Sequence, residues 1–320
     1  MKTSIKTLAI LATVGMFLVL IMGATVTNTE SEQGCGHTWP LCRGQFVPQF
    51  AVATAIEYAH RADAAVETIL ILALAMGALY LYRQHREVRI LVPLMVGFLF
   101  IQAGLGAWAV VYPQMAVAIA LHFGVSLIAF ASVLLTTIFL FEAEEGEEVR
   151  DRPIPTSFSR SVWGVTAFSY VVVYLGAYVR HSHADLACSG WPLCNGSILP
   201  LASGSVATNF VHRLAAGVLA LAIVGLVLAS RRLQATRPDL YRASLVALAM
   251  VALQALSGAV VVFTRLDLFS ALAHAATAGL LFGSLAYLCM HVLPRSARQL
   301  EMVPRGLVPQ AAVDPAGIPR

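Results

Sequence analysis

The sequence predicts an all-α integral membrane protein, in which eight transmembrane helices form two tandem four-helix bundles related by internal duplication. Of its 320 residues, 58% are hydrophobic and only 12% are charged, about half the charged share of ordinary soluble domains. The apolar residues gather in long unbroken runs instead of alternating, which favours helices over a membrane barrel. Residues of the first half also recur at a fixed spacing in the second half. This composition excludes a water-soluble enzyme and a disordered chain.

Eight apolar runs are long enough to cross a bilayer, which takes about 20 helical residues. In chain order they cover residues 8–26, 63–82, 90–111, 117–141, 161–179, 209–230, 243–263 and 268–293. The first run follows Lys2 and Lys6 and resembles a signal peptide, but it is long enough to span the membrane and has a counterpart later in the chain. We therefore expect it to remain as the first transmembrane helix.

Basic residues are distributed unequally between the segments that connect the runs. With both termini on the inner side, the outer side holds few of the 21 Lys and Arg residues, namely Arg43, Arg61, Arg180, Arg213 and Arg265. Cytoplasmic segments of membrane proteins carry an excess of Lys and Arg. The sequence therefore predicts a multi-pass protein of the cell membrane with both termini in the cytoplasm.

The internal repeat relates the two halves residue by residue. The segment Trp39-Pro40-Leu41-Cys42 recurs 152 residues later as Trp191-Pro192-Leu193-Cys194. The same offset relates His60-Arg61 to His212-Arg213, Gln102 to Gln254, Gly106 to Gly258 and His122 to His274, and an offset of 153 relates Gly23 to Gly176 and Cys35 to Cys188. We expect an N-terminal four-helix half at 1–141 and a C-terminal four-helix half at 161–293. An acidic, proline-containing linker at 142–160 and a proline-rich tail at 294–320 are expected to lie in the cytoplasm.

Four histidines lie in or beside apolar runs and obey the repeat: His60, His122, His212 and His274. Polar residues in lipid are costly and usually functional. A porphyrin iron takes one axial ligand on each face, and two helices of a bundle can supply both. Hydrogen bonding to a neighbouring carbonyl explains a single buried histidine, but explains two repeated pairs less well. The pattern therefore predicts two haem sites, one in each half.

Arg61 and Arg213 each follow one of these histidines. Two interpretations are open for them. Each guanidinium can pair with a haem propionate, because it matches a carboxylate bidentately. Alternatively, each arginine anchors its helix at the membrane surface by snorkelling.

The two predicted sites differ at one ionisable position. Glu57 lies three residues before His60, on the same helical face, and offset 152 places Asn209 at its counterpart. A carboxylate beside one haem and not the other indicates chemistry in the first half only. The alternative is that Glu57 caps the outer end of its helix. A di-iron site is disfavoured because it needs a second Glu-x-x-His pair and further carboxylates.

Four of the five cysteines form two close pairs in segments assigned to the outer, oxidising side. Four thiols allow three connectivities, and the repeat favours Cys35–Cys42 and Cys188–Cys194. Zinc is a weaker explanation, because the two spacings differ and the pairs lie in distant loops.

Together these features resemble the haem A synthases, and more narrowly the bacterial branch with cysteine pairs in its outer loops. The resemblance rests on the Cys-x6-Cys loop ending in WPLC, the EYAHR stretch at 57–61, the four membrane histidines and the duplication, and it extends from residue 8 to about 293. It implies an oxidoreductase acting on a CH group, which oxidises the C8 methyl of haem O to the formyl of haem A, with water as the oxygen source. This activity supplies haem A to terminal oxidases.

Carried over residue by residue, the resemblance assigns His60 and His122 to the iron of the substrate haem O. It assigns His212 and His274 to a permanent haem B, and it makes Glu57 the essential acid beside the substrate. The implied partners are a haem O synthase and a membrane electron acceptor, with a quinone as the candidate. No nucleic acid is implied.

Two other functions use some of the same residues. A dihaem b-type membrane cytochrome for quinol-linked electron transfer accounts for the four histidines, but does not explain Glu57 opposite Asn209. A haem transporter or chaperone without catalytic activity would form no aldehyde product. The pigments bound by the purified protein distinguish these functions.

Overall fold

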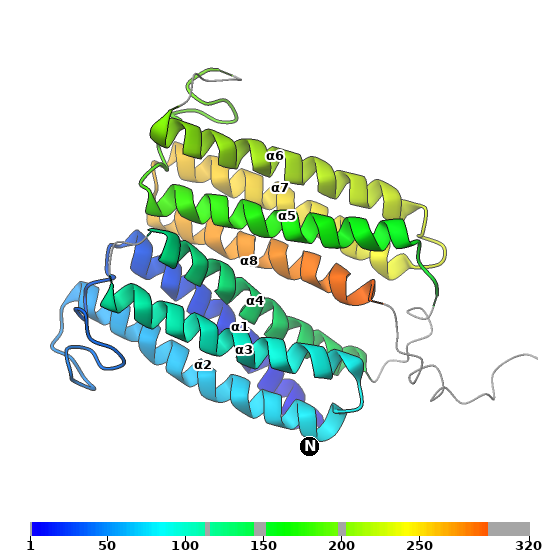
Figure 1. Cartoon of the computed structure of the whole chain (residues 1–320), viewed down its shortest axis with the longest axis horizontal. Coiled ribbons are helices and arrows are strands. Elements are labelled where there is room, and N and C mark those ends of the chain that lie inside the picture. Colours follow the sequence, from blue (N-terminus) through cyan, green and yellow to red (C-terminus); the bar gives the residue numbers. More distant parts are fainter. Residues whose placement is uncertain (1, 113–115, 144–151, 198–202, 294–320) are drawn as a thin grey trace, which may run out of the picture.

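A computed structural model describes residues 2–112, 116–143, 152–197 and 203–293, shown in Figure 1. Within these residues the chain forms eight α-helices and no β-strand. The helices are α1 (Lys2–Asn28), α2 (Val52–Tyr82), α3 (Arg86–Val111), α4 (Ala116–Glu142), α5 (Thr156–His181), α6 (Gly204–Arg231), α7 (Pro238–Phe263) and α8 (Leu268–His291). All eight are long and apolar enough to cross a membrane, which confirms the prediction of an all-α, multi-pass membrane protein.

The helices gather in two groups, α1–α4 and α5–α8, which lie side by side in Figure 1. The groups meet through four helices, because α1 packs on α8 and α4 packs on both α5 and α8. As a result α4 is the most buried of the described helices, whereas α2, α3, α6 and α7 lie on the outside of the assembly. In α1, Ala9, Ala12 and Met16 are fully buried in this packing.

Polar contacts join the two groups at both ends. At one end, Nη2 of Arg180 on α5 donates to the carbonyl of Thr27 on α1 over 3.2 Å. At the other end, the hydroxyl of Tyr287 on α8 donates to Oε1 of Glu142 on α4 over 3.1 Å. These contacts connect helices that are far apart in the sequence, so they support the packing of the two groups against each other.

Several helices extend beyond the apolar runs that predicted them. The largest difference is in α2, which begins at Val52 and not at residue 63. Its first three turns contain Glu57, His60 and Arg61. Because these residues are polar, this part of the helix is not within an apolar run. Helix α4 likewise continues through Glu142 and α5 begins at Thr156, so the predicted linker at 142–160 is shorter at both ends. Linker residues 144–151 and the predicted tail at 294–320 lie outside the described residues.

Two loops that carry the paired cysteines lie at the same end of the assembly, on the left in Figure 1. We call this the disulfide end. The loop after α1 has an isolated bridge between Cys42 and Gln45, and the loop after α5 has one between Cys194 and Ser197. Each loop also contains one cis Trp-Pro peptide.

Candidate functional site

The four repeated histidines lie on alternate helices: His60 on α2, His122 on α4, His212 on α6 and His274 on α8. The fold brings them together in the predicted pairs. His60 lies within electrostatic range of His122, and His274 lies within electrostatic range of His212. Each group of four helices therefore holds two histidines that lie near each other on different helices.

Each imidazole packs against a glycine of the preceding helix. A Cβ atom built on that glycine would lie 2.8–3.3 Å from Cε1 of the ring, which is too close for an ordinary contact. The pairs are Gly23 with His60, Gly106 with His122, Gly176 with His212, and Gly258 with His274. Glycine at these four positions therefore allows the backbone of the neighbouring helix to approach the histidine ring closely. A larger residue there would collide with the ring.

The ring nitrogens show whether these histidines suit an iron porphyrin. Among the described residues, Nδ1 of His60, His122 and His212 is buried and has no hydrogen-bond partner. His274 differs, because its Nδ1 lies 2.9 Å from Oγ of Ser257. Buried polar atoms in folded proteins are nearly always satisfied, so three unpaired Nδ1 atoms at matched positions indicate that these rings serve a partner other than the described residues. Paired imidazoles are common axial ligands of haem iron, and the residues fit such a group.

Glu57 is 3% exposed and is held at both carboxylate oxygens. The backbone N–H of Cys35 donates to Oε2 over 2.7 Å, and Nη2 of Arg61 lies 2.5 Å from Oε1. Glu57 does not cap its helix, because the N-cap residue of α2 is Ala51. The carboxylate instead connects α2, which carries His60, to the loop that contains the Cys35–Cys42 disulfide.

The counterpart of Glu57 makes a different connection. The side-chain amide of Asn209 donates to the carbonyls of Ala184 and Asp185, each over 2.8 Å. It therefore ties α6 to the second loop as Glu57 ties α2 to the first. The difference between the two sites is chemical, since a neutral amide cannot exchange a proton as a carboxylate can.

Arg61 and Arg213 both brace the loops at the disulfide end. Nη1 of Arg61 donates to the carbonyl of Thr38 over 2.7 Å. Arg213 donates to the carbonyls of Cys188 over 3.0 Å and Leu193 over 3.1 Å. Neither the propionate nor the anchoring interpretation anticipated these bonds, because they depend on how each loop folds back over its helix.

The cysteines are joined within each loop, as Cys35–Cys42 and Cys188–Cys194. All four are at most 1% exposed, so the bonds form the interior of their loops. Cys289 on α8 is buried and is the free cysteine among the described residues.

Two carboxyl groups of the loops are also shifted by their surroundings. Burial raises the pKa of Glu32 in the first loop, and Arg180 opposes that rise. Burial likewise raises the pKa of Asp185 in the second loop, although Arg180 lies 3.4 Å from its carboxylate. The disulfide end therefore holds two partly buried acids, one from each loop, that share Arg180 as a neighbouring cation.

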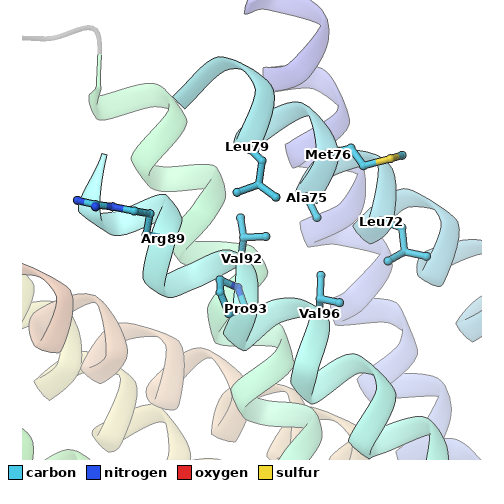
Figure 2. Close-up of a pocket in the computed structure, with 8 residues that line it drawn as sticks. All are labelled: Leu72, Ala75, Met76, Leu79, Arg89, Val92, Pro93 and Val96. Atoms are coloured by element: carbon cyan, nitrogen blue, oxygen red, sulfur yellow. The ribbon is translucent and has the colours of Figure 1, made fainter. Parts of the chain in front are cut away.

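Two further acids of α2, Asp63 and Glu67, were not predicted as site residues. Offset 152 places Ala215 and Leu219 at their counterparts, so the comparison that singled out Glu57 would also have found them. An apolar groove of about 630 Å³ lies further along, between α2 and α3 (Figure 2). It contains none of the predicted site residues, and Arg89 is its one charged lining residue.

The fold and the site together define a class: multi-pass membrane proteins whose helices carry paired histidines suited to porphyrin iron. Residues 49–286 match the family model COX15-CtaA, described as cytochrome oxidase assembly protein. The chain belongs to this family.

Curated relatives are similar over almost their whole length. A protein named "Heme A synthase" from Symbiobacterium thermophilum is 37% identical, over 91% of this chain and 96% of its own. One of the same name from Geobacillus kaustophilus is 40% identical, over 92% and 93%. Another from Bacillus licheniformis is 39% identical, over 94% and 100%.

Proposed function

We propose that this protein is a haem A synthase, which oxidises the C8 methyl group of haem O to the formyl group of haem A for terminal oxidases. The observation that carries the proposal is the unequal pair of sites. Both have two histidines packed on glycines, but only the first adds a buried carboxylate, Glu57, where the second has Asn209. The printed names of the relatives point to the same activity.

The proposal assigns one function to each half. The half at 1–141 takes haem O between His60 and His122, and the half at 161–293 holds a permanent haem B between His212 and His274. The two halves are proposed to descend from one duplicated four-helix unit. The matched histidines, glycines and cysteine pairs support this, because each recurs on the equivalent helix or loop.

In the proposed reaction, the methyl group and one water become a formyl group, with the release of four protons and four electrons. The bound haem B supplies one-electron transfer. Glu57 accepts a proton at its carboxylate or orients the water. The Cys35 N–H and the Arg61 guanidinium fix that carboxylate before substrate binds, so little reorganisation is needed during the reaction.

The proposed location and orientation of the protein follow from the distribution of basic residues and from the cysteine pairs. The protein is placed in the cell membrane, with the disulfide end outside and both termini in the cytoplasm. Electrons pass to a membrane acceptor, for which a quinone is proposed. A haem O synthase is the proposed supplier of substrate.

Pigment chromatography tests the function directly. The protein is expressed with a haem O synthase in a strain that lacks its own haem A synthase, and the haems are extracted and separated. We expect haem A in the membranes and haem B, with some haem O or haem A, on the purified protein. Two tightly held haem B groups and no haem A would favour the dihaem cytochrome instead.

The Cys35–Cys42 bond is expected to hold Glu57 in place, because Cys35 donates directly to that carboxylate. Replacing both cysteines by Ala should lower the melting temperature and haem A formation together. In the chain-entropy model, loss of a disulfide that closes a loop of this size lowers the free energy of unfolding by about 2–3 kcal/mol.

The matched control is Ala at both Cys188 and Cys194, which should lower the melting temperature but affect haem A formation less. Mass spectrometry of the alkylated wild-type protein checks that the Cys35–Cys42 bond exists. A redox role, and not a bracing one, would appear as lost turnover with unchanged melting temperature and haem content.

A further inference from the structure

Glu67 on α2 is a buried acid that the proposed reaction does not use. Its side chain is 2% exposed, and neither carboxylate oxygen has a hydrogen-bond partner among the described residues. The carboxylate lies directly against Gly15 of α1, where a Cβ atom would overlap it. One turn earlier, Oδ2 of Asp63 is also buried without a described partner. Unsatisfied polar groups of this kind are expensive within a membrane, so a partner for them is expected.

The second half fills the same positions with apolar residues. Leu219 is the counterpart of Glu67, Ala215 that of Asp63, and Phe168 that of Gly15 at the upstream offset of 153. Leu219 is buried in the hydrophobic core of that half, and Phe168 packs against the core. A four-helix half can therefore pack without these carboxyl groups. We infer that they serve a function of the first site that the second site lacks.

The position of Glu67 relates it to the histidine pair. It follows His60 by seven residues, so the two side chains leave α2 in nearly the same direction, about 10 Å apart along the axis. Both lie against glycines of α1, His60 on Gly23 and Glu67 on Gly15. A ligand that reaches both residues must be about as large as a porphyrin with its substituents.

The chemistry of the carboxyl pair limits which part of such a ligand it can contact. Carboxylates accept hydrogen bonds and repel anions, which excludes the propionates of a haem. Methyl and vinyl groups offer no hydrogen bond. Haem O, however, carries a hydroxyalkyl isoprenoid chain in place of one vinyl group of haem B, and its hydroxyl is a neutral donor.

We propose that Asp63 and Glu67 form a subsite that binds the hydroxyl group of haem O and so distinguishes haem O from haem B. This inference rests on the proposed function of the first half as the substrate site. It also explains the asymmetry, because the half proposed to hold haem B, which has no such hydroxyl, presents Ala215 and Leu219 instead.

Haem titration of the full-length purified protein tests the subsite. Haem O or haem B is added, and binding to the first half is followed by absorbance against the resident haem B. The wild type should prefer haem O. Glu67→Leu copies the packing of the second half and should bind haem O about tenfold more weakly, with haem B affinity unchanged. Glu67→Gln keeps an acceptor oxygen and should retain the preference.

The matched control is Thr68→Val, since the one hydrogen bond of the Thr68 hydroxyl among the described residues goes to the Ala64 carbonyl of its own helix, over 2.8 Å. It should leave both affinities unchanged. Retention of the resident haem B spectrum shows that each variant is folded. An unchanged haem O preference in Glu67→Leu overturns the subsite, and so does an equal loss in Glu67→Gln. If the wild type makes haem A in either case, the proposed function stands without the subsite.

Discussion

Glu57→Gln is expected to bind haem normally and to make almost no haem A. Gln keeps the size of Glu and can still accept the hydrogen bond from the Cys35 N–H, so the loop and the His60 site should survive. What it loses is the ability to take a proton, and a positioned acid or base contributes about 10²–10⁴ in rate. Chromatography should show haem O, or a partly oxidised alcohol, accumulating while haem B occupancy stays normal.

The control for this variant is Asn209→Ala, which removes the equivalent tie between helix and loop in the second half. It should lower the melting temperature and leave haem A formation largely intact. If Glu57→Gln makes haem A at near the wild-type rate, Glu57 only supports the loop and the chemistry lies elsewhere.

Replacement of His212 or His274 by Ala is expected to remove the resident haem B completely. Each of these histidines is one of the two residues proposed to hold haem B, so its loss would leave the iron with a single histidine ligand. The purified variants should lack the low-spin haem B spectrum. Haem A formation should stop as well, because electrons then have no route out of the first site.

His60→Ala and His122→Ala are the matched variants in the first half. They should keep the haem B spectrum and lose only the substrate haem. If the His212 and His274 variants keep a full haem B spectrum, the assignment of the two halves is wrong.

The eight helices could be predicted because a chain can cross lipid only as a helix or a closed barrel, in which every backbone hydrogen bond is satisfied. Each crossing needs a long apolar run, and the runs were visible without any knowledge of packing. The ends of the helices were harder to predict. Helix α2 starts eleven residues before its run, since Glu57, His60 and Arg61 are polar but form helix near the disulfide end.

The histidine and cysteine pairs could be predicted because the repeat marks them twice. The connections between them could not, because they run from side chains to loop backbone. The bonds from Arg61 to Thr38, and from Arg213 to Cys188, depend on loop conformation and leave no pattern in the sequence. Asp63 and Glu67 are an intermediate case, since they stand out only when each half is read against the other.

The hydrogen bond from Cys35 to Glu57 has a consequence for the maturation of the protein. The loop that contains Cys35 contributes directly to the proposed site, because its backbone N–H holds the Glu57 carboxylate that is proposed to act on the substrate. A newly inserted chain whose Cys35 and Cys42 thiols are still reduced would have its helices and histidines in place, but the Glu57 carboxylate would be poorly fixed. Oxidation of the first cysteine pair would then be required for activity, so a reduced chain would be folded but inactive.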